Sequence, residues 1–367
     1  MKVIEVTNTD FAMRQFLLPL MRAARARGHE VIGVTPEGPL LGAVRGEGFR
    51  VVALPFVRRL SPRAHLASFN ALIQIFRSEK PDLVHAHMPI SGFLARAAAR
   101  CARVPRVAYT CHGFLFRQPA RWPVRIATLT MEWLGGRFTD VYLTVSAEDA
   151  ALAHRLWISR RADAVGNGRD PALFRPDPAA RVRIRASLGT PADRVVIVIV
   201  SRLVEAKGYA ELLQAMHVLP EAELWVVGER LDSDRGADLA PLFAASGLGR
   251  RLKMLGYRED VPAILAASDI FVLPSHFEGL PMVLIEAMFC GLPVVASNIP
   301  GPREQVLPGV TGLLVPPADP QSLATALAAL AGAPERRRAM GQAGRARALA
   351  CYDESRVLAR TLDRLGL

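Results

Sequence analysis

Cysteine is scarce in this sequence, and nothing in its placement marks a metal centre. The 367 residues include four cysteines without a Cys-x-x-Cys pair, and eight scattered histidines without the spacing of a zinc site, so no metal is expected. No apolar run reaches the roughly 18–20 residues that cross a membrane. The first residues enter a strand pattern without a signal-peptide core, so we expect a cytoplasmic protein with reduced thiols.

Several motifs that would mark other functions are absent. No Gly-x-Gly-x-x-Gly follows an expected strand, which argues against nicotinamide or flavin binding. The chain has neither a Walker lysine loop nor a Gly-x-Ser-x-Gly elbow. A zinc finger, a basic zipper and the aromatic motif of RNA-recognition domains are missing too. Nucleic acid is therefore not an expected partner.

Acidic residues are too few to balance the basic ones, and the excess of basic residues lies in the first half of the chain. The net charge is +12, and residues 1–170 carry 24 basic against 13 acidic side chains, whereas residues 171–367 carry 22 against 21. A basic first half implies an anionic partner, for which an anionic membrane surface is the remaining candidate. A general preference for arginine is the alternative, because 42 of the 46 basic residues are arginine.

Short apolar runs alternate with longer amphipathic ones, which is the pattern of βα units and a parallel sheet. Expected strands span residues 3–6, 31–35, 51–54, 83–86, 106–110, 141–145, 195–200, 223–227, 253–255, 270–273 and 293–296. Expected helices span residues 13–27, 64–78, 91–103, 123–135, 147–154, 209–218, 237–245, 261–267 and 282–290, and the C-terminus is expected to be helical, with a final helix over 353–367. A stretch rich in glycine and proline, 166–178, reads as a linker. The expected fold class is α/β, with two doubly wound, Rossmann-like domains that face each other across a cleft, residues 1–170 and 171–352.

Two glutamates eight positions apart are the strongest functional signal. Glu278 follows an apolar run, 269–274, that predicts a buried strand, and Glu286 lies in a helix expected to begin at Pro281. Proline suits the first helical turn, and the free N–H groups of that turn attract an anion. A solvated turn and helix position are the alternative, but Glu286 is surrounded by apolar residues, where a carboxylate needs a partner.

An anion site with a carboxylate on each side matches a sugar nucleotide. The diphosphate would lie at the helix start, and the carboxylates would bind hydroxyls of the ribose at one end and of the hexose at the other. The residues expected to line the anion site are Gly279, Leu280, Pro281 and Met282.

Two cations follow the expected strand 195–200. Arg202 and Lys207 lie in the loop after it, and parallel sheets bind ligands at the carboxyl ends of their strands. Arginine can bind a phosphate through two hydrogen bonds and lysine acts as a point charge, so both suit a leaving diphosphate. A solvated loop is the alternative, which the nearby glutamates make the weaker interpretation.

Histidines follow two strands of the first half. His112 lies next to Gly113, where a ligand can approach the backbone, and it could bind a sugar hydroxyl or a phosphate, or act as acid or base. A satisfied structural histidine is an equal alternative. His85 and His87 form His-Ala-His, which is weak as a metal signal and fits ordinary polar residues at a strand end better. The Asp-x-Asp pair 232–234 is weaker still.

Residues 114–125 mix phenylalanine and tryptophan with arginine. Aromatic side chains that look exposed, with arginines beside them, fit contact with a membrane interface. A helical stripe in residues 65–80 is the second candidate, although an ordinary core-facing stripe explains it better.

Together these residues resemble the retaining glycosyltransferases of the GT-B fold, in the large group 1 or family-four class. The similarity covers nearly the whole chain and is densest over residues 196–317, with Glu278 to Glu286 as its most specific part. Further matches are Ser201-Arg-Leu, Lys207-Gly, Val226-Val-Gly-Glu, Leu255-Gly-Tyr-Arg-Glu-Asp-Val, Gly312-Leu-Leu-Val-Pro, Thr110-Cys-His-Gly and Asn167-Gly-x-Asp.

The resemblance implies a role for each candidate residue. Arg202 and Lys207 would hold the donor diphosphate. Glu286 would bind ribose hydroxyls, Glu278 would approach the transferred sugar, and His112 would lie by the reacting centre. Such enzymes usually need no metal, because the cations and the helix start carry the charge of the leaving group.

The resemblance also bears on the two ends of the chain. A last helix, 353–367 here, is expected to return to the first domain. Many relatives carry Gly-Gly after the first strand, where this chain has Thr7-Asn-Thr-Asp-Phe-Ala. The start is similar to the branch that builds capsule, exopolysaccharide or O-antigen units on a polyprenyl diphosphate.

The expected function is transfer of a sugar from a nucleoside-diphosphate sugar to a lipid-linked saccharide. The protein would work as a peripheral protein at the inner face of the plasma membrane. No residue stands out as a covalent nucleophile, so same-face attack guided by the departing phosphate is a plausible route to retention. Two alternatives stay open: a nucleotide-sugar 2-epimerase on the same fold, and a non-catalytic protein that binds a nucleotide sugar.

Overall fold

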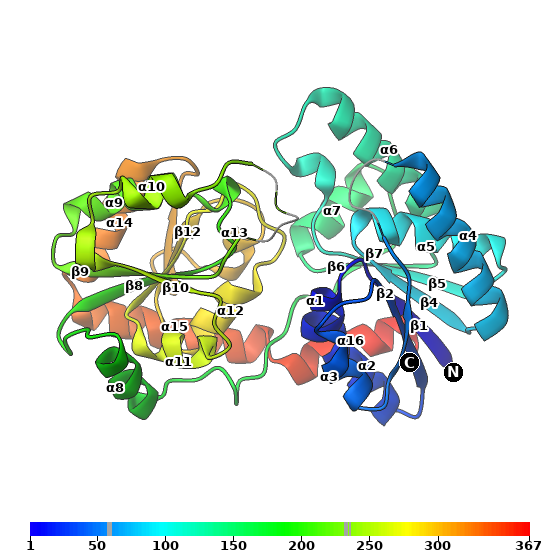
Figure 1. Ribbon diagram of the computed structural model, residues 1–367, viewed down its shortest axis with the longest axis horizontal. Coiled ribbons are helices and arrows are strands. Elements are labelled where there is room, and N and C mark those ends of the chain that lie inside the picture. Colours follow the sequence, from blue (N-terminus) through cyan, green and yellow to red (C-terminus); the bar gives the residue numbers. More distant parts are fainter. Residues whose placement is uncertain (57–60, 231–233, 235) are drawn as a thin grey trace. The chain divides into compact units, whose positions relative to one another are not determined.

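Two parallel sheets organise the chain, each in a unit of its own. The computed structural model describes residues 1–56, 61–230, 234 and 236–367. Unit 1 comprises Met1–Gly166 and Ser355–Leu367, and unit 2 comprises Asn167–Glu354. Helices cover both faces of each sheet (Figure 1), which explains why central strands such as Val195–Val200 and Ile270–Leu273 are apolar along their whole length.

Unit 1 contains a seven-stranded parallel sheet in the order β3-β2-β1-β4-β5-β6-β7. Its strands are β1 (Lys2–Val6), β2 (Glu30–Thr35), β3 (Arg50–Ala53), β4 (Leu83–His87), β5 (Arg106–Cys111), β6 (Val141–Thr144) and β7 (Ala162–Ala164). Its helices are α1 (Asp10–Ala12), α2 (Leu18–Ala26), α3 (Leu41–Gly46), α4 (Pro62–Glu79), α5 (Pro89–Cys101), α6 (Trp122–Arg137), α7 (Ala147–Arg155) and α16 (Glu354–Leu365). Shorter pieces are the π-helical turn Met13–Leu17 and the 3-10 turn Leu115–Arg117.

Unit 2 contains a six-stranded parallel sheet in the order β10-β9-β8-β11-β12-β13. Its strands are β8 (Val195–Val200), β9 (Ala222–Val227), β10 (Leu252–Gly256), β11 (Ile270–Leu273), β12 (Val294–Ser297) and β13 (Gly312–Val315). Its helices are α8 (Pro178–Ser187), α9 (Tyr209–Ala215), α10 (Ala240–Ala244), α11 (Val261–Ala267), α12 (Met282–Phe289), α13 (Pro302–Gln305), α14 (Pro320–Ala331) and α15 (Pro334–Cys351). The 3-10 turns are Glu205–Lys207, Met216–Val218 and Gly249–Arg251.

The strand orders place a topological switch point in each unit. The sheet grows outward from β1 and β4 in unit 1, and from β8 and β11 in unit 2. The loops that leave the carboxyl ends of two such neighbouring strands diverge to opposite faces, and open α/β sheets bind ligands between them. The loops after β8 and β11 are those that carry the two cations and the two glutamates.

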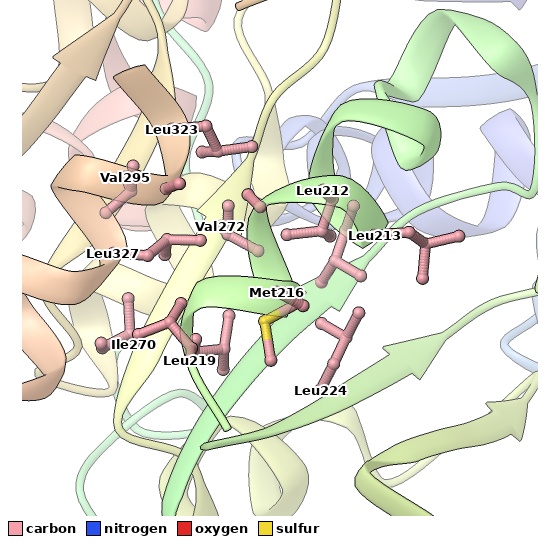
Figure 2. Close-up of a cluster of buried hydrophobic side chains, with 14 of the residues drawn as sticks. Leu212, Leu213, Met216, Leu219, Leu224, Ile270, Val272, Val295, Leu323 and Leu327 are labelled. Atoms are coloured by element: carbon pink, nitrogen blue, oxygen red, sulfur yellow. The ribbon is translucent and has the colours of Figure 1, made fainter. Parts of the chain in front are cut away.

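Leucine and isoleucine side chains fill one face of the sheet of unit 2. Figure 2 shows Leu212 and Leu213 of α9 with Leu323 and Leu327 of α14, close to side chains from β11 such as Ile270. These residues are almost fully buried. Burying a side chain of this size contributes about 1.5–3 kcal/mol, so this cluster holds the two central strands, and the loops that follow them, in place.

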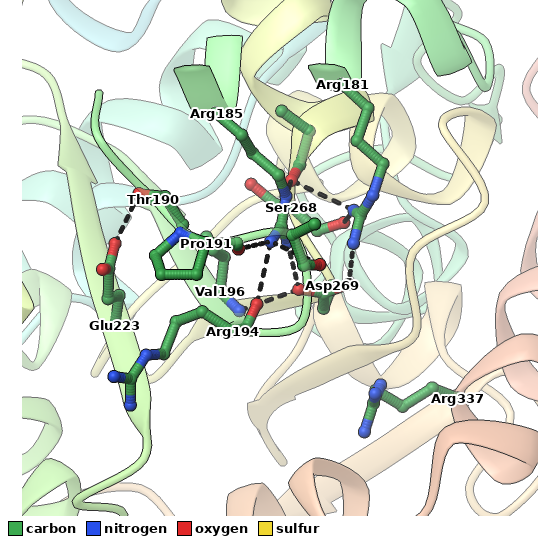
Figure 3. A network of polar contacts seen from close by, with 12 residues as sticks. Arg181, Arg185, Thr190, Pro191, Arg194, Val196, Glu223, Ser268, Asp269 and Arg337 are labelled. Atoms are coloured by element: carbon green, nitrogen blue, oxygen red, sulfur yellow. Dashed lines mark hydrogen bonds and ion pairs between the residues drawn. The ribbon is translucent and has the colours of Figure 1, made fainter. Parts of the chain in front are cut away.

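The chain enters unit 2 through a helix that the sequence interpretation missed. The linker was expected to end at residue 178 and no helix was expected after it, but α8 begins at Pro178, and Asp177 caps it by accepting a hydrogen bond from the N–H of Ala180 at 2.9 Å. Two arginines of α8, Arg181 and Arg185, both bind the carboxylate of Asp269, at 2.8 and 2.6 Å (Figure 3). Three arginines alternate with apolar residues in this helix, so its sequence shows no clear apolar stripe.

Other differences concern short elements. The sequence pattern did not reveal β7, β13 or α3, since each has three to six residues and too few positions for a period to show. The first helix was expected from residue 13, but it begins at Asp10. The side chain of Thr9 caps it by accepting from the N–H of Ala12 at 3.1 Å, which shortens the loop after β1.

The last helix belongs to unit 1. Leu362 of α16 packs in the cluster formed by α2 and its neighbours, and Leu365 packs beneath β1 and β4. A guanidinium N–H of Arg360 also donates to the carbonyl of Val165 at 3.3 Å.

Candidate functional site

The loops after β8 and β11 touch each other through their backbones. Gly208 adopts a φ of +73°, and a Cβ atom there would lie 2.0 Å from the carbonyl oxygen of Pro274. The N–H of His276 donates to the carbonyl of Ala206 at 2.8 Å. Glycine is therefore required at position 208, and it lets the lysine of one loop reach the glutamate of the other.

Lys207 and Glu278 form an ion pair at this junction. The Lys207 Nζ atom lies 2.7 Å from Glu278 Oε1, and the hydroxyl of Ser275 donates to the same oxygen at 2.7 Å. The two charged side chains are only 18% and 10% exposed, so water screens the pair incompletely. The structure thus brings together two of the residues that the sequence singled out.

The start of α12 lies beside this pair in the chain, and it is held by side chains from elsewhere in unit 2. Asn167 Nδ2 donates to the carbonyl of Leu280 at 2.7 Å, and Gln305 Nε2 donates to that of Pro281 at 3.0 Å. A Cβ atom on Gly301, whose φ is +89°, would lie 1.8 Å from the carbonyl oxygen of Gly279. These contacts fix the loop 279–281 firmly against its surroundings.

Pro281 lies at the N-cap and not inside the first helical turn, which corrects the expected helix start. The helix begins at Met282, and no side chain caps it. The N–H groups of its first turn therefore point outward from the helix start with the positive end of the helix dipole behind them. This is the anion-attracting arrangement that the sequence suggested.

Glu286 is 5% exposed and has a cationic partner that the sequence interpretation did not identify. Arg169 Nε lies 2.5 Å from Glu286 Oε1. The backbone of Arg169 is fixed in turn, since its N–H donates to the carbonyl of Tyr352 and its carbonyl accepts from the N–H of Glu354. The signal was available, because a carboxylate inside an apolar helix needs a cation, and Arg169 follows the noted Asn167-Gly pair.

Arg202 also has a partner of its own. Its guanidinium forms an ion pair with Asp234, whose side chain is buried, while that of Arg202 is 52% exposed. The loop after β8 therefore carries one cation bound to Glu278 and one bound to Asp234. Of the Asp-x-Asp pair considered as a metal signal, residue 232 lies outside the described residues.

His112 belongs to a polar cluster at the carboxyl ends of β1, β4 and β5 in unit 1. His87 Nδ1 lies 3.1 Å from His112 Nε2, and His87 Nε2 lies 2.9 Å from Glu5 Oε2. His85 Nδ1 lies 3.2 Å from the other carboxylate oxygen, and its Nε2 lies 2.8 Å from the hydroxyl of Thr110. The registers of β1 with β4 and of β4 with β5 put these side chains on one face of the sheet.

Burial and mutual contact shift the pKa values within this cluster. Burial would raise the pKa of Glu5, but charge and hydrogen bonds from His85 and His87 outweigh it and lower the pKa to about 2. Burial, with the nearby His85, lowers the pKa of His87 to about 4, against the opposing effect of Glu5. Burial and the other two histidines lower the pKa of His112 to about 3. At neutral pH, Glu5 is therefore ionised and both His87 and His112 are neutral.

Three members of the cluster also have the geometry of a metal site. Glu5, His85 and His87 each offer one ligand atom, and these atoms lie within 4.8 Å of one another. Every one of these atoms already takes part in a hydrogen bond, so the cluster is satisfied without an ion. Glu5 escaped the sequence interpretation, although a glutamate inside an otherwise apolar strand was a visible signal.

The segment 114–125 differs from the expectation of exposed aromatic side chains. Phe114 and Phe116 are buried and stack on each other with ring centroids 4.8 Å apart, because they complete the core beside β5. Trp122 is 72% exposed, and it opens a run of exposed residues, 122–127, at the start of α6 that also carries Val124 and Ile126. In the described part of the chain, no helix has the length and apolar character needed to span a bilayer.

Comparisons with known proteins match both units. The family model of glycosyl transferases group 1 matches residues 181–347, and that of glycosyltransferase family 4 matches residues 13–173. The UDP-Gal:alpha-D-GlcNAc-diphosphoundecaprenol alpha-1,3-galactosyltransferase of Escherichia coli is 32% identical over 279 residues, which cover 74% of this chain and 71% of that relative. The chain belongs to the group 1 glycosyltransferases. A D-inositol 3-phosphate glycosyltransferase of Corynebacterium efficiens is also 30% identical over 359 residues, or 92% of this chain and 82% of that one.

Solved structures show which fold this glycosyltransferase has. HepE of Anabaena, solved in complex with UDP, superimposes with a TM-score of 0.85 at 22% identity and covers 100% of both chains. Together with the two parallel sheets, this confirms the predicted GT-B fold. Family membership confirms the predicted enzyme class, a glycosyltransferase.

Proposed function

We propose that this glycosyltransferase moves a sugar, with retention of anomeric configuration, from a nucleoside-diphosphate sugar to a saccharide linked to a polyprenyl diphosphate. Unit 2 binds the donor. The observation that carries this proposal is the Lys207–Glu278 ion pair beside the uncapped start of α12. It unites a cation for phosphate and a carboxylate for sugar hydroxyls at the switch point of the sheet.

The roles follow from the charges. The diphosphate binds at the N–H groups of Met282 and Val283, and Lys207 and Arg202 neutralise the charge that grows as the sugar leaves. Glu278, oriented by Lys207, accepts hydrogen bonds from hydroxyls of the transferred sugar. Glu286, held by Arg169, accepts them from the ribose. No metal is required in this scheme, because Lys207 and Arg202 neutralise the charge of the leaving diphosphate.

The acceptor belongs to unit 1 in this proposal. The E. coli relative acts on a sugar carried by diphosphoundecaprenol, which supports a lipid-linked acceptor. The excess of basic residues in the first half suits a diphosphate lipid and an anionic membrane surface. The protein would therefore act as a peripheral protein at the cytoplasmic face of the plasma membrane, in assembly of a cell-surface polysaccharide such as capsule, exopolysaccharide or O-antigen.

Calorimetry with UDP-, GDP- and ADP-sugars, followed by turnover assays, tests the proposal. We expect one nucleotide class to bind and its sugar to appear on a polyprenyl-diphosphate saccharide with the anomeric configuration of the donor, as read by NMR. An epimerised donor formed without acceptor, or tight binding without any turnover, would contradict it. An inverted product would overturn retention alone.

Glu286→Ala is expected to weaken nucleotide binding about 10- to 100-fold, because hydrogen bonds to a charged group contribute about 1.5–3 kcal/mol. Glu223 provides the matched control, since it is a buried glutamate of unit 2 paired with Lys253 at 2.9 Å. Glu223→Ala should leave the nucleotide Kd unchanged even if it lowers the melting temperature. Equal losses of affinity in the two variants would show that Glu286 acts through stability only.

The first half of α6 is the proposed membrane contact. Trp122→Ser combined with Ile126→Ser should weaken binding to vesicles of anionic lipid about tenfold or more, because both exposed apolar side chains lose their place in the interface. Val182→Ser is the control, since Val182 is an equally exposed apolar residue, at 71%, on α8 of unit 2. Flotation at low and high salt measures the effect, and salt-insensitive absence of binding by the unmodified protein would remove this part of the proposal.

A further inference from the structure

Hydrogen bonding in the cluster around Glu5 has a direction. The ionised carboxylate of Glu5 can only accept, so His87 must donate to it through Nε2–H. A neutral His87 then carries a lone pair on Nδ1. This lone pair faces His112 Nε2 at 3.1 Å, and His112 must therefore supply the proton of that bond.

His112 is left with a bare Nδ1 atom by the same reasoning. Among the described residues, this atom has no hydrogen-bond partner, and the atom itself is not buried. The residue is partly exposed, so Nδ1 is open to a ligand. The ring itself is held between His87 at 5.4 Å and Phe16 at 6.4 Å, measured between ring centroids.

We propose that Glu5 and His87 are positioning residues, which hold His112 in the one tautomer whose Nδ1 atom accepts a hydrogen bond from a sugar hydroxyl. The lowered pKa values of His87 and His112, caused first by burial, support the neutral state that this arrangement needs. The proposal rests on the function proposed above, because it takes the ligand of His112 to be a sugar.

The arrangement decides between roles that the sequence left open for His112. A neutral imidazole with its lone pair toward the ligand cannot donate a hydrogen bond to a phosphate oxygen, and it cannot act as a general acid. It can accept from a hydroxyl group and so orient a sugar. The relay through His87 resembles in its logic the carboxylate that fixes the tautomer of a catalytic histidine in a hydrolase, although here it passes through a second imidazole.

Nitrogen NMR of the full-length protein tests the tautomer without any substrate. With histidine labelled in both ring nitrogens, long-range proton–nitrogen spectra at neutral pH should show His112 as a pure Nε2–H tautomer. Its signals are assigned by their loss in His112→Asn. A protonated His112, or an Nδ1–H tautomer, overturns the proposal. A stoichiometric metal ion in the purified protein also overturns it, because a metal held by Glu5, His85 and His87 would replace the Nε2–H proton that His87 donates to Glu5.

A matched pair of variants tests the role of His87. His87→Phe keeps a ring but offers no acceptor, whereas His87→Asn can place a carbonyl oxygen near the former Nδ1 atom. We expect His87→Phe to mix the tautomers of His112 and to lower kcat about tenfold, with little change in the KM for the donor nucleotide. His87→Asn should restore most of the Nε2–H tautomer of His112 and most of the kcat. Unchanged kcat in a folded His87→Phe variant, or no recovery in His87→Asn, would contradict the positioning role.

The two proposals fail in different ways. If no acceptor supports sugar transfer, the proposed function fails while the tautomer in the wild-type spectrum still stands. If transfer occurs but His112 has the other tautomer, only the relay fails. Should His87→Phe not fold, as judged by circular dichroism, the wild-type spectrum and His87→Asn still decide the matter.

Discussion

Lys207→Ala should lower kcat by about 30- to 1,000-fold, which corresponds to a loss of about 2–4 kcal/mol of transition-state stabilisation. Negative charge accumulates on the leaving diphosphate as the bond to the sugar breaks. A cation that is only 18% exposed interacts with that charge more strongly than one in open water. Removing Lys207 also frees Glu278, whose uncompensated charge would then repel the leaving group.

The chain offers a close control for this experiment. Lys253 is also 18% exposed and pairs with the 9% exposed Glu223 in the same unit, but it contacts the backbone carbonyl of Leu188 and the hydroxyl of Thr190. Lys253→Ala should therefore lower the melting temperature without lowering kcat. Steady-state kinetics under saturating donor compare the two variants. Equal losses of kcat would mean that Lys207 supports the fold and not the reaction, and an unchanged kcat in Lys207→Ala would remove it from the site.

The order and type of most elements could be predicted because the two sheets are buried on both faces. A strand such as β8, Val195–Val200, consists of apolar β-branched residues alone, and its expected bounds agree with the structure. Elements were missed where their burial produces no periodic pattern of apolar residues in the sequence. In α8, polar contacts of Arg181 and Arg185 with Asp269 replace an apolar stripe, and an ion pair between residues 84 or more positions apart leaves no local pattern.

The site could be predicted in part for the same physical reason. Glu278 and Lys207 each follow a strand, and the rule that parallel sheets bind ligands at the carboxyl ends of their strands can be applied to a sequence. Their direct pairing depends on the close approach at Gly208, which no spacing indicates. The partners of Glu286 and Arg202, which are Arg169 and Asp234, come from distant segments, so the sequence showed only that a buried charge needs a partner.

Acid should destabilise unit 1 at a higher pH than surface carboxylates can explain. An unfolded histidine binds a proton below its ordinary pKa of 6.5, whereas folded His87 and His112 remain neutral down to about pH 4 and about pH 3. The unfolded state therefore binds more protons in this window, and the free energy of unfolding falls as the pH is lowered. Glu5 acts in the same direction between its ordinary pKa of 4.5 and about 2, because the folded protein keeps this carboxylate ionised.

Denaturant unfolding of unit 1 at pH 7, 6 and 5 measures the effect, which we expect to reach about 2–4 kcal/mol for the two histidines together. His87→Phe removes one of the two groups. The fall in the free energy of unfolding with decreasing pH should then become less steep, by the amount that corresponds to about one bound proton. His217→Gln serves as the control because it removes an exposed histidine of unit 2. A free energy that stays constant from pH 7 to 5, or a slope that His87→Phe leaves unchanged, would mean that these imidazoles take up protons in the folded protein at the same pH as in the unfolded chain. His112 would then be protonated in part near pH 6, and it could donate a hydrogen bond as well as accept one.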